Sequence, residues 1–301
     1  MKRAANMLVT GGSGFIGRAL VQSFANDGWN VTVADVAPFP GPVHSIVGNL
    51  SDPEVLRRAV RANTDAVVHL AAVTSVVKTV DDPVGTYQVN VQLTADLLEL
   101  CRRCGVESFL LASTNAVAGN VGQAIIDENT PPHPLTPYGA TKAAAEMLLS
   151  GYSASYGLRG CAVRLANVVG PGMARKDSLV PRVLRAACEG RGIEVYGDGT
   201  QVRDFVSVRD AVAGFQTALR AGHVGPLVIG SGKSVSVNRL VELARLVTEM
   251  PIPVRYLAAK AIEMPAVVLD IGMARRLGYA PMHELDTALA EAWHELRSGS
   301  G

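Results

Sequence analysis

The stretch Thr10-Gly-Gly-Ser-Gly-Phe-Ile-Gly17 decides how the first part of the chain folds. It follows the short apolar run Met7-Leu-Val9, and apolar residues then recur at helical spacing at Phe15, Ile16, Leu20, Val21 and Phe24. A strand, a glycine loop and a helix in this order predict a dinucleotide-binding unit, with an ordinary glycine-rich turn as the alternative. We expect Gly11 to permit the tight turn, Gly14 to let backbone N–H groups approach a pyrophosphate, and Gly17 to let the helix pack closely on the strand.

The next predicted strand, Val31-Thr-Val-Ala-Asp35, favours the dinucleotide interpretation. Asp35 stands at its end, about twenty residues after the glycine loop, where a carboxylate accepts hydrogen bonds from the ribose hydroxyls of the adenosine. A 2′-phosphate would face this acid. The sequence therefore predicts NAD rather than NADP as the cofactor.

The composition is that of an ordinary globular protein, with 301 residues of which 48% are hydrophobic and 18% charged. A net charge of +1 gives no reason to expect nucleic acid or an anionic membrane as a partner. No apolar run reaches the length of a membrane span and no signal-peptide pattern precedes the first strand, so we expect a soluble, cytoplasmic protein. Metal-ligand spacing is absent, so no metal is predicted, and Cys101 and Cys104 are interpreted as reduced thiols.

Strands and helices alternate through the first two-thirds of the chain. Beyond the first two strands, apolar runs that predict buried parallel strands lie at 67–70, 109–111 and 162–165. Helical patterns lie between them, at about 53–62, 83–104 and 138–156. This alternation predicts an α/β fold, a Rossmann-type doubly wound parallel sheet with helices on both faces and ligands at the carboxyl ends of its strands.

After Leu165 the pattern changes, and we expect a small, discontinuous C-terminal substrate lobe that closes over the strand ends. Its expected elements are a breaker-rich loop at 167–172, helices near 178–190, 236–249 and 284–296, and strands at 193–196 and 254–256. Residues 204–208, the helix after them and 227–229 are expected to return to the main sheet. The predicted division is 1–166 with 204–230 for the NAD-binding domain, 167–203 with 231–297 for the lobe, and 298–301 for a flexible tail.

The candidate catalytic residues lie around a tyrosine and a lysine. Tyr138 and Lys142 stand four residues apart in a predicted helix, hence on one face. The ordinary pKa of tyrosine, about 10, is too high for a base at neutral pH, but a nearby ammonium and the positive nicotinamide ring favour the phenolate. Just upstream, the strand at 109–111 runs into Ala112-Ser-Thr-Asn-Ala116, which places hydroxyls at the carboxyl end of a parallel strand. We expect Thr114 to hold a substrate oxygen there, with Ser113 as the second candidate, and the alternative is that these hydroxyls only cap the turn.

Together these residues resemble the extended short-chain dehydrogenase/reductase family, and within it the NAD-dependent nucleotide-sugar epimerases and dehydratases. The match runs from the glycine loop to near residue 280. Its landmarks are residues 10–17, Asp35, 49–52, 69–72, Asn90, 113–114, 138–142, 164–167, 170–172 and 197–204.

The resemblance implies a role for each matching position. The cofactor-binding positions are Gly11, Gly14, Phe15, Ile16, Gly17, Asp35, Leu50, Asp52, Leu70, Ala71, Ala72, Asn90, Tyr138 and Lys142. Leu50 and Asp52 approach the adenine, and Lys142 also holds the nicotinamide ribose. The substrate-binding positions are Ser113, Thr114, Asn115, Tyr138, Asn167, Arg203 and Lys260. Arg203 pairs with the substrate diphosphate, for which its planar donor fork is suited. The family habit is also a homodimer through the helices near 83–104 and 138–156.

Several positions depart from the family's pattern. Dehydratases carry an Asp-Glu pair directly after the catalytic threonine, where this chain has Asn115 and Ala116, and decarboxylases usually have glutamate at the second of these positions. Ala118 replaces a tyrosine and leaves extra space or a different contact near the sugar. Lys260 stands at the start of an element that normally reads Arg-Pro-Gly-Asp, so it keeps the positive charge but loses the bidentate fork.

The leading hypothesis is therefore an NAD-dependent nucleotide-sugar 4-epimerase that acts on a UDP-hexose or UDP-hexuronic acid through a transient 4-keto sugar. Thr114, Tyr138 and Lys142 are its catalytic residues. The alternative is another nucleotide-sugar enzyme (a decarboxylase, a dehydratase or a sugar dehydrogenase) that starts with the same oxidation and then diverges. A third hypothesis, a non-catalytic NAD-binding regulator, conflicts with the intact Thr, Tyr and Lys.

Overall fold

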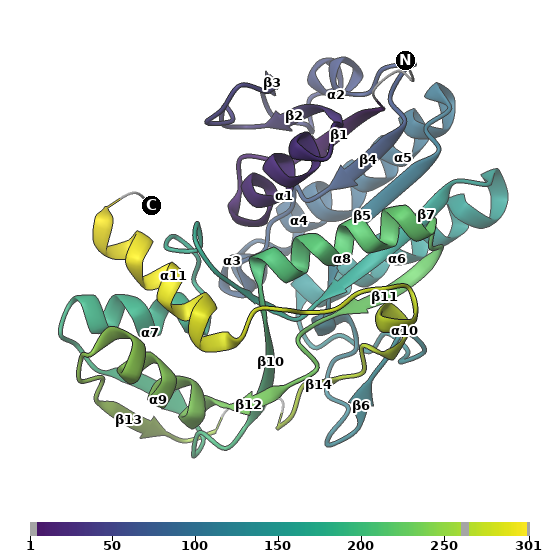
Figure 1. Ribbon diagram of the computed structural model, residues 1–301. Helices are drawn as coiled ribbons and strands as arrows, with labels where there is room; N and C mark the ends of the chain where they lie inside the picture. Colours follow the sequence, from purple (N-terminus) through teal and green to yellow (C-terminus); the bar gives the residue numbers. More distant parts are fainter. Residues whose placement is uncertain (1–4, 260–264, 300–301) are drawn as a thin grey trace.

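The computed structural model describes residues 5–259 and 265–299, and its larger part is a seven-stranded parallel sheet (Figure 1). In spatial order the strands are β11 (Gly225–Ile229), β7 (Arg159–Leu165), β5 (Ser108–Thr114), β4 (Ala66–His69), β1 (Asn6–Thr10), β2 (Asn30–Asp35) and β3 (His44–Val47). The chain builds outward from β1 first on one side and then on the other, so the strand order reverses between β1 and β4. The predicted Rossmann-type sheet is confirmed, and its switch point is where such folds bind ligands.

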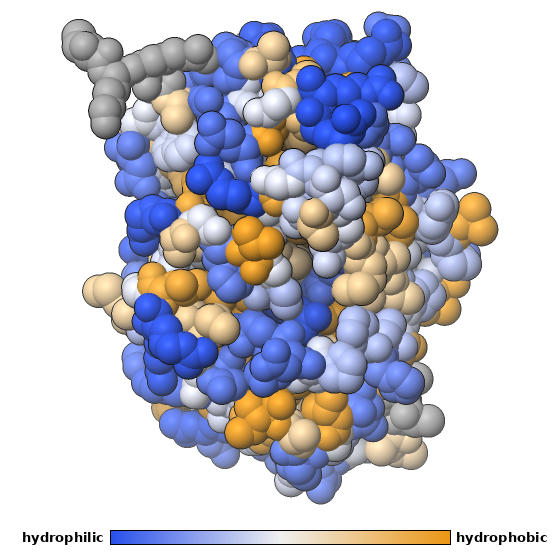
Figure 2. Space-filling model, turned by 90° about the vertical axis from the view of Figure 1, so that its right-hand side faces the viewer, coloured by the Kyte–Doolittle hydropathy of each residue, from blue (hydrophilic) through white to orange (hydrophobic). Residues whose placement is uncertain are grey.

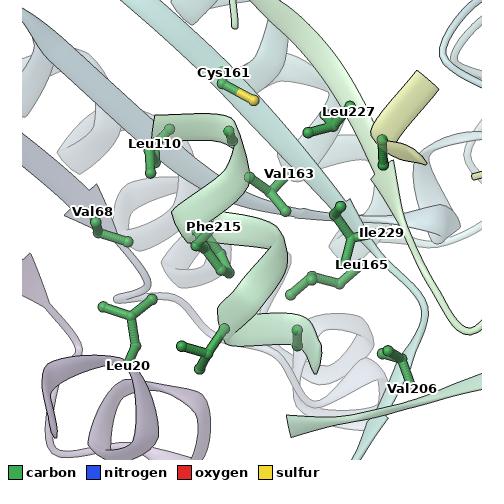
Figure 3. Close-up of a cluster of buried hydrophobic side chains, with 14 of the residues drawn as sticks. Leu20, Val68, Leu110, Cys161, Val163, Leu165, Val206, Phe215, Leu227 and Ile229 are labelled. Carbon is green, nitrogen blue, oxygen red and sulfur yellow. The ribbon is translucent and has the colours of Figure 1, made fainter. Parts of the chain in front are cut away.

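Helices cover both faces of this sheet, and each face has its own hydrophobic core. On one face α1 (Phe15–Asn26) packs beside α8 (Val208–Ala221), and Figure 3 shows Phe215 of α8 surrounded by Leu20 of α1 and by sheet residues such as Val163. On the other face lie α2 (Pro53–Ala59), α5 (Leu93–Cys104) and α6 (Pro137–Tyr156). Successive residues of one strand belong to opposite cores because strand side chains alternate between the two faces.

The helical pattern predicted at 83–104 forms one uninterrupted but not uniform helical segment. It begins as α4 (Pro83–Tyr87), passes through a π-helical turn at Gln88–Gln92 and continues as α5. The short helix α3 (Val76–Asp81) precedes it. π-Helical turns are rare and often lie near functional sites, and this one carries the buried Asn90.

The rest of the chain builds a smaller lobe below the main sheet in Figure 1. Its helices are α7 (Leu179–Cys188), α9 (Val237–Thr248) and α11 (Leu285–Ser298), which share a third hydrophobic cluster. Its strands pair as β12 (Ser234–Ser236), β10 (Val202–Ser207) and β8 (Asn167–Val169) in one sheet and as β13 (Val254–Leu257) with β9 (Ile193–Tyr196) in another. The remaining elements are the pair β14 (Val268–Leu269) and β6 (Ile125–Ile126), and α10 (Gly272–Arg276). The predicted division of the chain into a discontinuous domain and lobe stays a prediction.

Several sequence-based expectations differ from the structure. Residues 204–208 do not return to the main sheet, because β10 pairs with β8 and β12, while β11 does return. The loop expected at 167–172 contains β8, and β3 at the sheet edge was not predicted. Ser298 ends α11 rather than beginning a tail, and residues 300–301 lie outside the described part of the chain.

Within residues 5–259 and 265–299, no helix has the length and apolar character of a membrane span. On the face drawn in Figure 2, hydrophobic residues form separate groups between hydrophilic ones. The cysteines, which all lie in described segments, are free thiols, and Cys101 is buried in the core.

A buried histidine joins three elements beneath the carboxyl ends of the strands. Thr94 Oγ1 donates to the Asn90 carbonyl at 2.8 Å, so it accepts from His69 Nε2 at 3.1 Å, and His69 Nδ1 then accepts from Thr10 Oγ1 at 2.6 Å. This network requires a neutral imidazole. Burial, and secondly the charge of Lys142, lowers the pKa of His69 from 6.5 to about 3.

His69 should make the fold sensitive to acid. Between pH 6.5 and about 3 the unfolded chain binds a proton at this residue that the folded chain does not, so stability falls as the pH falls. Through His69 alone, a change from pH 7.5 to 5.0 should remove about 2 kcal/mol from the free energy of unfolding. Urea unfolding at both pH values measures this loss.

The comparison variants are His69→Gln, which removes the titration, and His294→Gln, which removes an exposed histidine. His69→Gln should show a smaller loss of stability on acidification than the unmodified protein, and His294→Gln should show the same loss. Equal pH dependence in all three proteins would contradict the prediction.

Candidate active site

A cavity of about 340 Å³ lies at the carboxyl ends of the central strands. Its wall combines the glycine loop, the end of β2, the turns after β3 and β4, the first turns of α6 and one lysine from the smaller lobe. The predicted site residues that line it are Gly11, Gly14, Phe15, Ile16, Gly17, Asp35, Leu50, Leu70, Ala71, Ala72, Ser113, Tyr138 and Lys142. Most of the predicted cofactor positions therefore come together around one space.

Each glycine of the loop is required for a different physical reason. Gly11 has φ +69°, and a Cβ there would lie 2.6 Å from Ala71 N. A Cβ on Gly17 would lie 2.6 Å from Gly12 Cα. Gly17 therefore lets the helix approach the loop, whereas the sequence pattern predicts a close approach of the helix to the strand. Gly14 is the N-cap of α1, and a Cβ on it would meet only the Gly11 carbonyl oxygen, at 3.2 Å. No side chain caps this helix, so its first N–H groups are available to a phosphate.

Asp35 forms another part of the wall, at the end of β2. Its carboxylate accepts hydrogen bonds from Ser13 N at 3.0 Å and Ala37 N at 3.2 Å, which fixes it beside the glycine loop. Two described cations line the cavity. Lys142 lies on α6, and Lys176 is bonded to Thr74 in the turn after β4. Among the described residues of the wall, no cation therefore lies beside Asp35 to offset its charge against a 2′-phosphate.

Asp35→Ala should narrow the preference for NAD over NADP by about tenfold, because it removes the like charge that a 2′-phosphate would face. Titration calorimetry with both dinucleotides gives the two dissociation constants. Asp81→Ala removes an exposed carboxylate from α3 and should leave the preference unchanged. Tighter binding of NADP than of NAD by the unmodified protein would contradict the assignment.

Two predicted cofactor residues do not line the cavity. Asp52 is exposed and caps α2, since its carboxylate accepts from Glu54 N at 2.9 Å. Asn90 is buried, and its amide bonds Val73 N at 2.8 Å, Val73 O at 3.0 Å and Thr141 Oγ1 at 3.1 Å. Asn90 thus fixes the turn after β4, which forms part of the wall, instead of facing the cavity itself.

Tyr138 and Lys142 lie on successive turns at the start of α6, whose N-cap Thr136 accepts from Gly139 N at 3.2 Å. Burial raises the pKa of Tyr138 to about 12, while a hydrogen bond with Thr114 lowers it. Burial lowers the pKa of Lys142 to about 8. In the described part of the chain, no group accepts a hydrogen bond from the Lys142 ammonium, which lines the cavity and is thus available to a ligand.

The two hydroxyls at the end of β5 have different environments. Thr114 Oγ1 accepts from Ala116 N at 3.2 Å and so caps the turn, yet the same side chain contacts Tyr138. Ser113 is 3% exposed and donates to the carboxylate of Glu146. The Ser113 hydroxyl thus already has a buried acceptor, and the substrate contact expected of this residue, which lines the cavity, stays a prediction.

A second cavity, of about 180 Å³, lies in the smaller lobe. Asn167 and Arg203 both line it, together with Arg182, and Asn167 Nδ2 donates to the Asp204 carbonyl at 3.0 Å. Asn115 lies in the 3₁₀ turn at Asn115–Val117 and lines neither cavity. Lys260 lies outside the described residues.

The expected space beside the sugar at Ala118 is not present. Ala118 has 0% exposure and belongs to the main hydrophobic cluster, so it packs in the core rather than beside a ligand. Among the described residues, no group of three His, Cys, Asp or Glu side chains is arranged to hold a metal ion.

Sequence reasoning missed Lys176, which reaches the cavity from the loop between β8 and α7. Its ammonium donates to Thr74 Oγ1 at 3.1 Å, and partial burial lowers its pKa. This contact joins the smaller lobe to the turn after β4. No pattern marks Lys176, because it stands in an irregular loop without periodicity.

The model of the NAD dependent epimerase/dehydratase family matches residues 7–230, from β1 to the end of the main sheet. The chain belongs to this family. As a member of the NAD dependent epimerase/dehydratase family it is an enzyme whose cofactor is NAD. The cavity fits that cofactor, since an uncapped helix start, Asp35 and the available Lys142 ammonium match its pyrophosphate and its two riboses.

Relatives within the NAD dependent epimerase/dehydratase family include enzymes of two reaction types. UDP-glucose 4-epimerase from Streptomyces lividans is 33% identical over 312 residues, which cover 95% of this chain and 94% of the relative. dTDP-glucose 4,6-dehydratase from Mycobacterium tuberculosis is 34% identical over 262 residues, which cover 81% and 78%. Among solved structures, MoeE5 in complex with UDP-glucuronic acid and NAD has a TM-score of 0.91 at 34% identity, covering 98% of this chain and all of that one. The two curated relatives carry out different reactions, so the comparisons show the family of this chain and not its reaction.

Proposed function

We propose that the protein is a nucleotide-sugar 4-epimerase that acts on a UDP-hexose or UDP-hexuronic acid. The observation that carries this proposal is that the side chains directly after Thr114 cannot transfer a proton. Thr114 and Tyr138 share a hydrogen bond, but the next positions are Asn115 and Ala116, which cannot transfer a proton. Among the described residues that line the main cavity, Asp35 is the one carboxylate, and it is bonded to the glycine loop.

Epimerisation needs fewer groups than its alternatives. Tyr138, as the phenolate, removes the proton of the sugar 4-hydroxyl, and the Lys142 ammonium one turn away favours that phenolate. The Thr114 hydroxyl holds the same oxygen as it becomes a carbonyl, and Tyr138 returns the proton in the reverse step. NAD, when bound, supplies the acceptor and then the donor of the hydride at C4. Elimination of water would need a further acid and base that Asn115 and Ala116 do not provide.

The nucleotide part of the substrate is proposed to occupy the second cavity. Arg203 and Arg182 would face its diphosphate, and Asn167 stands beside them. This arrangement would leave the sugar between the two cavities. The relatives that bind UDP-linked sugars support this class of substrate for the chain.

The alternative enzyme begins with the same oxidation and then loses water, carbon dioxide or the reduced cofactor. The similarity to a dTDP-glucose 4,6-dehydratase supports loss of water as the alternative reaction. A non-catalytic NAD-binding regulator would differ from every enzyme by the absence of turnover, since bound NAD alone does not separate them.

Incubation with UDP-glucose, UDP-galactose and UDP-glucuronic acid in deuterated water separates these reactions. The product should have the mass of the substrate, inverted C4, no net NADH and no carbon-bound deuterium, because the C4 hydrogen never reaches solvent. Loss of the mass of water with deuterium at carbon would indicate a dehydratase, release of carbon dioxide a decarboxylase, and stoichiometric NADH a dehydrogenase. Each of these three results would overturn the epimerase proposal.

We also propose a homodimer through the two long helical segments. Exposed apolar side chains lie on both, with Val84 67% and Tyr87 50% exposed on α4, and Met147 56% and Tyr156 58% exposed on α6. Burial of such residues against a second copy would be favourable. Multi-angle light scattering should give twice the mass of one chain, and a monomer at micromolar concentration would contradict the proposal.

A further inference from the structure

A cluster of three buried polar side chains lies directly behind the catalytic candidates. Ser113 of β5, Glu146 of α6 and Arg164 of β7 are each no more than 4% exposed. Ser113 precedes Thr114 in the chain, and Glu146 follows Lys142 by one helical turn. The cluster is therefore attached to both elements that carry the catalytic groups.

Glu146 is the centre of this cluster. Arg164 Nη2 donates to Glu146 Oε2 at 2.8 Å, Arg164 Nε lies 3.2 Å from both carboxylate oxygens, and the Ser113 hydroxyl donates to Oε1. The remaining arginine nitrogen, Nη1, donates to the carbonyl of Thr130 at 3.2 Å and, more weakly, to those of residues 127 and 128. A fully hydrogen-bonded ion pair of this kind defines one geometry, because a buried charge without its partner is costly.

The charged and titratable groups around Lys142 come from several elements. Glu146 lies on its own helix, Tyr138 one turn before it, neutral His69 on β4 and Arg164 on β7. The Arg164 charge is directed at Glu146 and at three carbonyls. The negative charge of Glu146 raises the pKa of Lys142 against the effect of burial, which lowers it. Glu146 is thus the carboxylate that favours an ammonium in the cavity wall.

We propose that Glu146 is a positioning residue, whose carboxylate keeps Lys142 charged and ties the strand end that carries Thr114 to the helix that carries Tyr138. Arg164 and Ser113 hold this carboxylate in place. The inference rests on the proposed catalytic function of Tyr138 and Lys142. It adds a group that touches no ligand but sets the protonation of one that does.

The test follows the protonation of Lys142 directly. The chain has lysines at positions 2, 78, 142, 176, 233 and 260, so a protein labelled with 13C at the lysine ε-carbons gives few signals, and Lys142→Arg assigns the relevant one. In Glu146→Gln the midpoint of the Lys142 titration should fall by about one pH unit, because the charge that favours the ammonium is removed. The alkaline limit of epimerisation should move to lower pH as well.

Asp210→Asn is the matched control, because Asp210 is a 2% exposed carboxylate on α8 that accepts from Met282 N at 3.0 Å and lies in another part of the fold. It should leave the Lys142 midpoint unchanged. If Glu146→Gln does not fold, the double variant Glu146→Gln/Arg164→Gln keeps an uncharged hydrogen-bonded pair. It should show a smaller downward shift, because the positive charge of Arg164 is removed as well.

An unchanged Lys142 midpoint in the folded single or double variant overturns the positioning role. The titration needs no turnover, so it is independent of the proposed reaction. A shifted midpoint in a protein without epimerase activity would support the action of Glu146 on Lys142 and would overturn only the proposed function.

Discussion

Tyr138→Phe is expected to reduce turnover by about a hundredfold or more while leaving the affinity for NAD nearly unchanged. The substitution deletes only the phenol oxygen and leaves the ring that lines the cavity. Burial raises the pKa of this phenol to about 12 and the hydrogen bond with Thr114 lowers it. In the proposed reaction the phenolate would therefore need the positive charges of Lys142 and of bound NAD beside it. Steady-state rates with the active UDP-sugar and calorimetric NAD binding measure the two effects.

Tyr152→Phe is the matched control for this experiment. Tyr152 lies on the same helix, but its hydroxyl contacts Glu99 at 3.4 Å, away from the cavity. It should turn over at the rate of the unmodified protein. A Tyr138→Phe variant that did the same would show that the proposed base is wrong.

Lys142→Met should lower both turnover and NAD affinity, the first by about a hundredfold and the second by about tenfold. Lys142 is 3% exposed, and in the described part of the chain its ammonium has no acceptor, so its hydrogen bonds are available to the nicotinamide ribose. Methionine has a similar length and supplies neither charge nor donor. The same two measurements separate binding from chemistry.

Lys78→Met, at an exposed position of α3, should change neither quantity. If Lys142→Met lost turnover but bound NAD normally, the lysine would act on Tyr138 alone. Normal values for both quantities would exclude any function of Lys142 at the site.

The repeated order of apolar strand and amphipathic helix was enough to predict the main sheet. The same reasoning placed β10 in the wrong sheet, because a short apolar run has the same pattern whichever strands it joins. Its partner β8 is three residues long and lies in a stretch that also contains two glycines and a proline, so local sequence favoured a loop. Pairing between distant segments decided this part of the fold.

The candidate site was predictable where the chemistry lies in local spacing. Tyr138 and Lys142 share a helix face, and continuing the same interval of four residues leads to Glu146, a signal that was present and not used. The hydrogen bond of Ser113 could not be predicted in this way, since its acceptor Glu146 stands 33 residues later and only the fold brings the two together. Lys176 was missed for the same reason, because its partner Thr74 is 102 residues away.

In the turn after β5, the positions that are proposed to set the reaction type differ from the position that packs in the core. Asn115 and Ala116 are half-buried and belong to none of the hydrophobic clusters, whereas Ala118, two residues later, is in the core. Proton-transferring side chains could therefore be exchanged at these two positions without repacking either face of the sheet. Under the proposed function, one scaffold could in this way serve enzymes that return a sugar as its epimer and enzymes that dehydrate it, through changes that cost the fold little stability.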